Sequence, residues 1–368
     1  MTTSPMFMDV SGAEPREQDP WESVVIPKET IEAEIERLAS IPRPANGRRA
    51  SLIRHPKSTA PGFGLAPGID VTISVLKPGE SVDPIRRNST QLDMCLRGEG
   101  AVSVAGREFG IGWRDVWNTP SMQVQSARNT GRDLFVRLTY SNAPLLEKLE
   151  VHYVEENPPV KAIEDRAGAI KRQSSARRAR EMAENIALGE DGARLLGYEY
   201  LIDIDVIESK ALIWRWLEVQ KHLPQIKAIG RGYSGRRLYV LYNPATERRN
   251  GTTHSFFATI SSRPPEVVDA PHRHSSAAIN YYLLGHGWSK VNGRHLEWKA
   301  GDLMLSAPGW AIHGHASKEE SISSMTVQDH PLHIAMESLI WQESLEGPVL
   351  ALGSEAGFES NRAQLESA

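Results

Sequence analysis

An internal repeat constrains the fold of this chain more than any other feature of the sequence. Shifting the sequence along itself by 187 residues brings Val71–Leu145 into register with Ala258–Leu332 without a gap. The identical positions include Thr72-Ile73-Ser74 with Thr259-Ile260-Ser261, Pro78 with Pro265, Pro84 with Pro271, Gly98 and Gly100 with Gly285 and Gly287, Gly106-Arg107 with Gly293-Arg294, Asp115 with Asp302, and Pro144-Leu145 with Pro331-Leu332. Most of these residues shape chain reversals, so the chain is expected to contain two copies of one turn-rich unit.

Each copy has the pattern of an all-β unit. Short runs rich in branched or aromatic residues recur between turn residues, and in the first copy they are Val71–Leu76, Ser89–Leu96, Gly100–Val104 and Val116–Thr119. This pattern predicts an antiparallel barrel or sandwich. The 368 residues are enough for two domains of ordinary size, each with its own core.

Helical patterns occur only outside the two copies. Ile31, Ile35 and Leu38 have helical spacing in Glu29–Leu38, and Ala176–Ala187 is typical of an exposed charged helix whose arginines, at 177, 178 and 180, form a solvated face. The segment Leu212–Leu223 is apolar enough to pack on a barrel. We therefore expect an N-terminal arm over 1–65, a first barrel over 66–150, a helical connector over 151–235, a second barrel over 236–345 and a tail over 346–368.

Composition argues against several classes of partner. The net charge of −4 gives no electrostatic reason to expect nucleic acid or a membrane surface. No apolar stretch approaches the roughly 20 residues of a membrane span, and the first ten residues lack the basic and apolar segments of a signal peptide, so a cytoplasmic location is expected. The single cysteine, Cys95, fits a reducing compartment, and its apolar neighbours predict a core residue.

The second copy carries a cluster of histidines that predicts a metal site. His272 and His274 are two residues apart at the start of a predicted strand, so their side chains share one face. His313 follows beyond the turns at Gly293 and Gly301-Asp302, on a strand expected to be adjacent. Three neutral imidazoles leave coordination positions for substrate and dioxygen at iron(II), although zinc is also well served by imidazoles.

The first copy supplies an internal control for this interpretation. The positions that match His272, His274, His313 and His315 are occupied there by Ile85, Arg87, Ser126 and Arg128. The glycines and prolines that shape the turns are kept in both copies. Residues needed only to build the barrel should occur twice, so the histidines are expected to serve chemistry, and the first barrel is expected to hold no metal.

These motifs resemble those of the cupin superfamily. The first cupin motif is similar to His272-Arg273-His274 with Gly285, and the second is similar to Gly301-Asp302, Pro308 and His313 with one extra residue before the histidine. Ala278 stands where that family usually has an acidic ligand, which reduces the set to three histidines. The resemblance implies an all-β fold of two cupin barrels (jelly-roll, double-stranded β-helix) in tandem, with helical N-terminal and connector segments.

Among cupins, the chain resembles the bicupin ring-cleaving dioxygenases that act on gentisate, salicylate or 1-hydroxy-2-naphthoate. The likeness extends over LIWRW (212–216), YNPAT (242–246), His313 with His315, and DHPL (329–332). It implies an extradiol-type enzyme that uses Fe(2+) and O2 on a hydroxylated aromatic substrate, in a homo-oligomer. Those enzymes usually hold the metal in the first barrel. A metal in the second barrel resembles instead the large subunit of hydroquinone dioxygenases, which has a small partner subunit.

Residues around the histidines are expected to contact the substrate. The gentisate-type enzymes resembled here carry an arginine eight residues after the first ligand, where this chain has Asn280, so Asn280 is expected to donate a hydrogen bond and Arg263 is a second candidate to hold a carboxylate. His315 is the candidate general base or acid. Tyr282 and Trp310 are candidate pocket residues, with core packing as the alternative for each, and Asp329 would orient a ligand or cap a loop. The histidines at 254, 286, 295, 330 and 333 are expected to be structural or on the surface.

Two other kinds of function remain open at this point. Cupins with three-histidine sites also cleave diketones, oxidise thiols or isomerise sugars. A non-catalytic bicupin would bind a small ligand at the metal without turnover. Oxygen consumption with hydroxylated aromatics separates the ring-cleaving enzyme from the binding protein.

Overall fold

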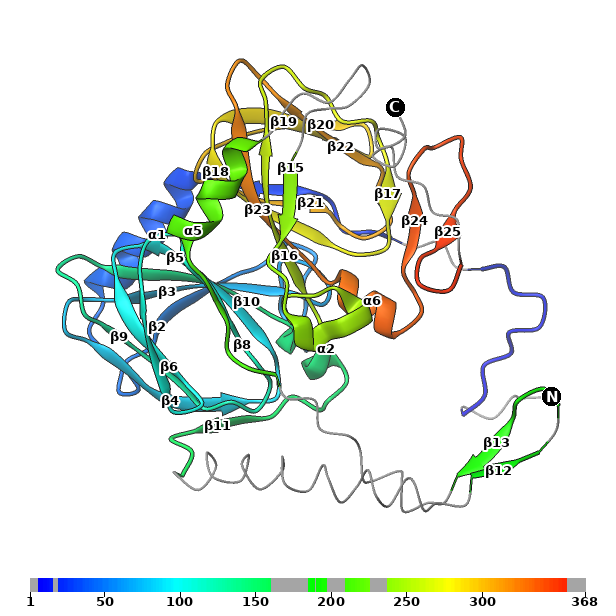
Figure 1. The fold of residues 1–368 in the computed structure, drawn as a ribbon, viewed down its shortest axis with the longest axis horizontal. Coiled ribbons are helices and arrows are strands. Elements are labelled where there is room, and N and C mark those ends of the chain that lie inside the picture. Colours follow the sequence, from blue (N-terminus) through cyan, green and yellow to red (C-terminus); the bar gives the residue numbers. More distant parts are fainter. Residues whose placement is uncertain are drawn as a thin grey trace.

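The computed structural model describes residues 6–15, 19–159, 185–188, 190–196, 209–225 and 237–355. Within these ranges the chain forms two β-barrels, which lie at the lower left (cyan) and upper right (yellow and orange) of Figure 1. The all-β fold expected from the repeat is confirmed. None of the helices in the described ranges combines the length and the apolarity that a membrane span needs.

The two barrels repeat the same elements in the same order. The first contains β3 (Asp70–Leu76), β4 (Ser81–Arg87), β5 (Gln91–Arg97), β6 (Gly100–Val104), β7 (Arg107–Ile111), β8 (Val116–Thr119), β9 (Gln125–Asn129), β10 (Phe135–Ser141) and α2 (Ala143–Lys148). The second contains β16 (Phe257–Arg263), β17 (Arg273–His274), β18 (Ala278–Leu284), β19 (His286–Val291), β20 (Arg294–Lys299), β21 (Leu303–Ala307), β22 (His313–Ser317), β23 (Ile322–Gln328) and α6 (His330–Ala335). Strands β3, β5 and β10 have the same bounds as β16, β18 and β23 after the shift found in the sequence, so the repeat is a structural duplication.

The barrels pack on each other through their largest sheets. In the first barrel the order is β14-β8-β5-β10-β3-β2, where β14 is Ile213–Trp214 and β2 is Arg49–Ile53. In the second it is β1-β21-β18-β23-β16-β15, where β1 is Val24–Ile26 and β15 is Arg237–Val240. One hydrophobic cluster joins alternate residues of the two sheets, with Val71 and Ile73 on one side and Ile260 and Val327 on the other. Because side chains alternate across a strand, the intervening residues of the same strands face the interior of each barrel.

Each barrel interior is only partly filled by apolar residues. A small cluster that includes Trp117 and Phe135 fills one part of the first interior, and a cluster that includes Tyr282 and Trp298 fills part of the second. Cys95 belongs to the first cluster, as expected, and burial raises the pKa of its thiol to about 12. The remaining interior positions are polar, and they form the two sites described below.

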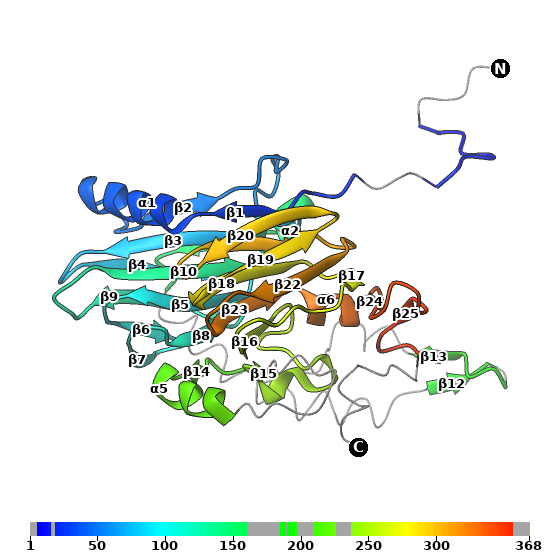
Figure 2. The ribbon, with the colours of Figure 1, turned by 90° about the horizontal axis from the view of Figure 1, so that it is seen from above.

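The N-terminal arm connects both barrels instead of forming a separate unit (Figure 2). Strand β1 (Val24–Ile26) pairs with β21 of the second barrel, and β2 (Arg49–Ile53) pairs with β3 of the first. Between them lies α1 (Lys28–Ser40), which buries the three apolar residues whose spacing predicted it. The sequence did not predict this crossing, because three residues of β1 are too few to carry a periodic signal.

The aspartate shared by the two copies holds an accessory helix in each. Asp302 accepts the backbone N–H of Lys28, the first residue of α1, at 2.7 Å. Asp115 accepts the backbone N–H of Trp216, the first residue of α5 (Trp216–Val219), at 2.8 Å. The repeated Gly-x-x-Asp and Lys-x-x-Asp turns therefore serve docking as well as chain reversal.

The described parts of the connector contain strands as well as helix. β11 (Val154–Glu156) joins β4, and β14 (Ile213–Trp214) joins β8, so the apolar connector segment does pack on a barrel. A hairpin is formed by β12 (Asn185–Ala187) and β13 (Arg194–Leu196). The helix predicted over 176–187 falls largely outside the described residues, and its last three residues form β12. The other short elements are η1 (Gln220–Gln225), β15 (Arg237–Val240), η2 (Pro244–Arg249), β24 (Ile340–Gln342) and β25 (Leu350–Ala351).

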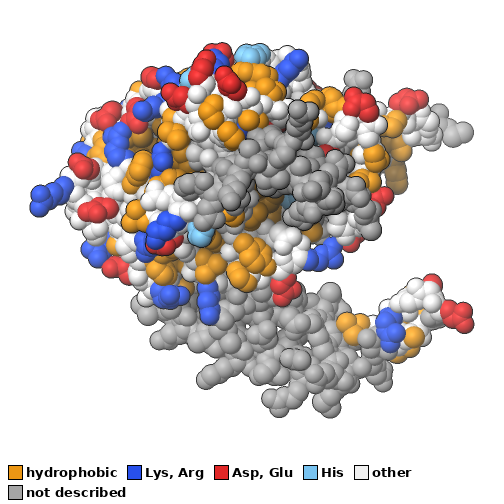
Figure 3. Space-filling view, turned by 45° about the horizontal axis from the view of Figure 1, so that its top comes forward, with side chains coloured by type: hydrophobic (Ala, Val, Ile, Leu, Met, Phe, Trp, Pro, Cys, Tyr) orange, Lys and Arg blue, Asp and Glu red, His pale blue; other side chains and the backbone are white. Residues whose placement is uncertain are grey.

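Surface charge is mixed on the face shown in Figure 3. Lysine and arginine side chains alternate with aspartate and glutamate over the described part of this face. The described part of this face therefore does not present a field of one sign.

Candidate metal centre

Backbone pairing brings together the three histidines predicted from the sequence. His272 and His313 exchange both backbone hydrogen bonds, at 3.0 and 2.9 Å, so they are directly opposite on adjacent strands and share a face. His274 is two residues further along and lies on that face as well. One ring nitrogen from each of the three lies within 4.8 Å of the others. In the part of the chain that the structure describes, this is the one cluster of three or more histidine, cysteine or acidic side chains close enough to hold an ion.

The same local hydrogen bond fixes the orientation of all three rings. Each Nδ1 lies near a backbone carbonyl oxygen two residues away, at 3.3 Å for His272 and Ala270, 2.8 Å for His274 and Ser276, and 2.9 Å for His313 and Ala311. A carbonyl oxygen only accepts, so Nδ1 carries the proton in the neutral ring and Nε2 keeps its lone pair. Histidine ligands of metals are commonly oriented in this way. The donor set fits a divalent transition metal.

Burial favours the neutral form of the ring at the centre of the cluster. Burial lowers the pKa of His274 well below its usual value, and the neighbouring charge of His272 lowers it further. A ring with this pKa needs no proton removed near neutral pH before it binds a metal.

An indole ring covers one side of the cluster. Trp341 on β24 stacks on His274, with the ring centres 4.7 Å apart, and lies 5.6 Å from the ring of His272. The position follows from strand pairing, because Trp341 is opposite His274 between β24 and β17. Trp341 was missed in the sequence because it lies beyond the span over which the two copies have similar residues. Its counterpart in the first barrel is Val154, which is opposite Arg87 as Trp341 is opposite His274.

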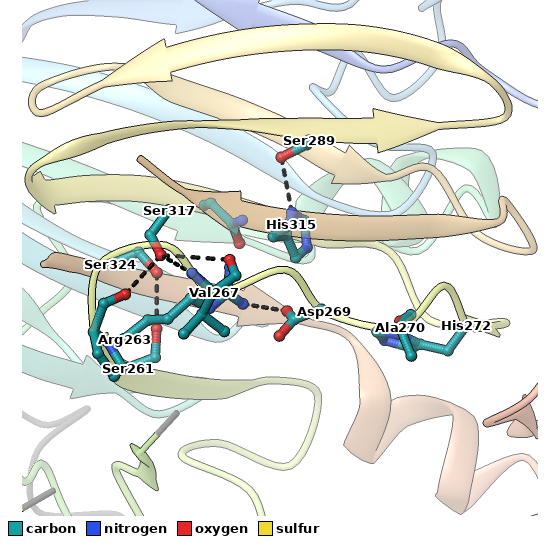
Figure 4. A network of polar contacts seen from close by, with 12 residues as sticks. Ser261, Arg263, Val267, Asp269, Ala270, His272, Ser289, His315, Ser317 and Ser324 are labelled. Carbon is teal, nitrogen blue, oxygen red and sulfur yellow. Dashed lines mark hydrogen bonds and ion pairs between the residues drawn. The ribbon is translucent and has the colours of Figure 1, made fainter. Parts of the chain in front are cut away.

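His315 lies on the same strand face as His313, as predicted, and a hydroxyl group holds it. The centres of the two rings are 5.7 Å apart. Nδ1 of His315 contacts the hydroxyl of Ser289 at 2.8 Å, and the indole N–H of Trp298 donates to that same hydroxyl at 2.8 Å (Figure 4). These contacts hold a half-exposed imidazole beside the three histidines. His315 is not itself a member of that cluster.

Asn280 is a buried amide with an unused acceptor. Its side chain is 5 % exposed, and its nitrogen donates to the hydroxyl of Tyr282 at 3.3 Å. Its oxygen, Oδ1, has no hydrogen-bond partner among the described residues. Because buried polar atoms are normally paired, a ligand hydroxyl that donates to Oδ1 would satisfy it.

The structure places the other three predicted pocket residues in roles closer to packing. Tyr282 is 2 % exposed and stacks on Trp298 with ring centres 3.7 Å apart. Trp310 is half-buried and lies beneath the guanidinium of Arg273, at 4.5 Å from the ring centre. Arg263 forms an ion pair with Asp269, and both side chains are largely buried (Figure 4). The charge of Arg263 is therefore already matched inside the protein.

Two residues that follow β23 contact the loop after His274 and so support the cluster. Asp329 accepts the backbone N–H of Ala277 at 2.8 Å and so holds the loop after His274. Nδ1 of His330 lies 3.5 Å from the hydroxyl of Ser276, which contacts Nδ1 of His274 at 3.0 Å. Burial lowers the pKa of His330 to about 4, so this ring is neutral near pH 7. His330 is thus a structural residue that borders the site.

Comparison with known proteins agrees with this architecture. A family model described as the AraC-like ligand binding domain matches residues 256–353, which cover the second barrel. A solved salicylate 1,2-dioxygenase of Pseudoaminobacter salicylatoxidans, with gentisate adducts, superposes with a TM-score of 0.69 at 15% identity, over 92% of this chain and 89% of that one. This chain has the fold of two cupin barrels in tandem. At that identity the superposition speaks for the fold alone.

Two curated relatives of this bicupin are also ring-cleaving dioxygenases by name. Gentisate 1,2 dioxygenase 1 of Aquipseudomonas alcaligenes is 26% identical over 118 residues, which are 32% of this chain and 29% of the relative. The 5-nitrosalicylic acid 1,2-dioxygenase of a Bradyrhizobium species is 26% identical over 135 residues, 35% of this chain and 65% of the relative. The matched segments thus span less than two thirds of either relative. In sequence and fold the bicupin resembles the ring-cleaving dioxygenases.

Proposed function

We propose that this bicupin is an iron(II)-dependent dioxygenase that opens the ring of a hydroxylated aromatic compound with O2. The observation that carries the proposal is the group of three histidines whose Nδ1 atoms are all held by backbone carbonyls. The likeness to gentisate, nitrosalicylate and salicylate dioxygenases supports the same class of substrate.

His272, His274 and His313 would hold the iron through Nε2. When bound, iron(II) would supply the electron-transfer chemistry that lets dioxygen react with an electron-rich ring. Three protein ligands leave positions on one side for the oxygens of the substrate and of dioxygen. Ala278, which occupies the usual acidic position, is buried and adds no ligand.

The remaining residues would position the ring and move a proton. Oδ1 of Asn280 would accept a hydrogen bond from a ring hydroxyl. His315, fixed by Ser289, would take the proton of a second hydroxyl and return it as the ring opens. Trp341 would exclude water from the side of the cluster that it covers.

The candidate substrates are gentisates, substituted salicylates, hydroxynaphthoates and hydroquinones. The polar residues of the second barrel favour some of these over others. Asn280 cannot form the bidentate charged pair that an arginine forms with a carboxylate. Arg263 is already paired with Asp269. We therefore favour a ring whose hydroxyl groups, and not a carboxylate, make the main polar contacts.

The test is anaerobic reconstitution with iron(II), followed by oxygen uptake and ultraviolet spectra with gentisate, salicylate, 1-hydroxy-2-naphthoate and hydroquinone in parallel. The expected result is uptake with a new ring-fission chromophore, largest with hydroquinone-type rings. Zinc-loaded protein is the matched control, because zinc fills the site without redox chemistry. The proposal is contradicted if the protein binds iron but consumes oxygen with none of the four compounds, even after a small cupin partner has been sought by copurification.

The match to the AraC-like ligand binding domain favours a second candidate, a small-ligand binding protein without turnover. In that case the same titration would give saturable binding of an aromatic compound, seen in its spectrum, with neither oxygen uptake nor a new chromophore.

A further inference from the structure

The first barrel contains a cavity of about 240 Å³ at the place where the second barrel has its histidines. Its lining includes Ile85, Arg87 and Ser126, which are the counterparts of His272, His274 and His313. The two sites are therefore equivalent positions of the duplicated fold. One is built from imidazoles, and the other is built from different chemistry.

Six charged side chains line this cavity, and four of them lie on strands of the repeated unit. These four are Asp70 on β3, Arg87 on β4, Asp93 on β5 and Arg137 on β10. The corresponding residues of the second barrel are Phe257, His274, Asn280 and Ser324, in the same order. Since the second barrel closes without these charges, the fold itself does not require them.

Several of these buried groups lack the partners that they would need in a purely structural role. Within the described ranges, Nε of Arg87, Nε of Arg137 and Oδ2 of Asp93 have no hydrogen-bond partner. The other two arginines of the lining are matched, Arg48 by Glu156 and Arg49 by Glu80. An unpaired polar atom away from water costs free energy, so the Nε–H groups of these two arginines are expected to meet water or a bound acceptor.

The two carboxyl groups do not fully offset the arginines near neutral pH. Oδ1 of Asp93 accepts the hydroxyl of Thr139 at 2.5 Å, and burial raises the pKa of Asp93. Burial also raises the pKa of Asp70, to about 7, against the opposing charge of Arg87. The guanidiniums stay charged throughout the physiological range. The cavity thus keeps excess positive charge when either carboxyl takes up a proton.

We propose that the first barrel binds a small organic carboxylate, with its oxygens held between Arg87 and Arg137. Guanidinium groups pair with carboxylates in a planar, charge-assisted geometry. Val82 and Ile85 line the same cavity and offer an apolar surface for the body of the acid. The volume lies below the roughly 300 Å³ at which pockets for drug-sized ligands begin, so the ligand is a small acid.

The test uses 4-fluorobenzoate as the probe, with fluorine NMR of the full chain in its zinc-loaded form. The probe lacks a ring hydroxyl, so it is not a substrate of the proposed ring-cleaving activity. A carboxylate can also coordinate zinc, so the measurement is repeated on the metal-free protein, in which binding by the first barrel should persist. Arg87→Gln and Arg137→Gln should each weaken binding by about tenfold or more, because a charged hydrogen bond is lost. The matched control is Ser324→Ala, at the position equivalent to Arg137 in the second barrel, which should leave the affinity unchanged. The uncharged analogue 4-fluorobenzamide should not bind.

Two outcomes of this experiment would overturn the proposal. One is that the unaltered protein does not bind the probe. The other is that Ser324→Ala weakens binding of the probe whereas neither arginine change does. Crystals of the unaltered protein soaked with 4-iodobenzoate give a test that does not depend on variants folding. Anomalous signal from iodine inside the first barrel supports the site, whereas ordered water alone in that cavity contradicts it.

Discussion

The imidazole of His274 and the indole of Trp341 stack with their centres 4.7 Å apart and their planes 29° from parallel. The contact joins two paired strands, β17 and β24, that are far apart in the sequence. It orients a ring that is also held at Nδ1 by Ser276, so His274 has restraints both on its edge and on its face.

The stacking predicts that Trp341 contributes to metal affinity without binding the metal. Trp341→Ala should weaken affinity for zinc by about tenfold, in line with losses at residues that orient metal-bound histidines. Trp341→Phe should retain most of it, because an aromatic face remains. The check is competition with a chromophoric chelator, with the exposed Trp113→Ala as control. Equal affinity in all three variants would show that the indole has no such role.

His272 is the most exposed of the three histidines, which makes it the best place to remove a ligand without disturbing the core. His272→Ala should abolish stoichiometric metal binding, measured by elemental analysis after reconstitution, while the circular dichroism spectrum keeps its β signature. His295→Ala, at an exposed position on β20, is the control and should retain the metal. Full metal content in the His272 variant would mean that the assigned site is wrong.

Much of this architecture could be predicted because the chain contains its own comparison. The shared turn residues give the strands of both barrels, and the histidines present in one copy alone mark the site. The comparison fails where the two copies pair alike but their sequences differ, as at Trp341, which corresponds to Val154, and at β1, which pairs with β21 as β14 pairs with β8. The comparison also did not reveal the cavity of the first barrel. It shows that the histidines are missing there, but it does not show that Arg87, Asp93 and Arg137 meet in one place. That requires knowledge of how two sheets face each other, because β5 and β10 pair in one sheet of the barrel and β4 belongs to the other.

The buried amide of Asn280 gives a prediction that separates binding from chemistry. Asn280→Leu removes the acceptor Oδ1 at nearly constant volume, so KM for the best hydroxylated ring should rise about tenfold through one lost hydrogen bond. The hydroxyl of Tyr282 meets Met304 and Asn280 inside the core, so Tyr282→Phe should change KM far less. Steady-state oxygen uptake measures both. A larger effect for Tyr282→Phe would reverse the assignment.

His315 is expected to act on the substrate and not on the metal. His315→Gln should lower kcat by about 10²-fold, the usual contribution of a positioned acid or base, with metal content unchanged. Ser289→Ala, which removes the hydroxyl that holds the ring, should produce a smaller loss in kcat. Single-turnover kinetics with metal analysis distinguish these results. Loss of metal from the Gln variant would place His315 among the ligands.

Asp70 makes stability depend on pH, with a sign that can be checked. Burial raises the pKa of this carboxyl from 3.8 to about 7, so the folded protein binds the proton more tightly than the unfolded chain. Its contribution is therefore fully present below about pH 4 and is lost as the pH rises to about 7, with a total of ~4 kcal/mol at most. The groups that face it are Arg87, which opposes the rise in pKa, and Glu147, which adds to it.

Asp70→Asn removes this titration. The free energy of unfolding in urea should therefore differ less between pH 5 and pH 8 for the variant than for the unaltered protein. Glu147→Gln, outside the cavity lining, is the control and should reduce the difference only slightly. An unchanged pH dependence in Asp70→Asn would mean that this carboxyl is ionised in the folded protein, and the two arginines of the first barrel would then be largely neutralised from within.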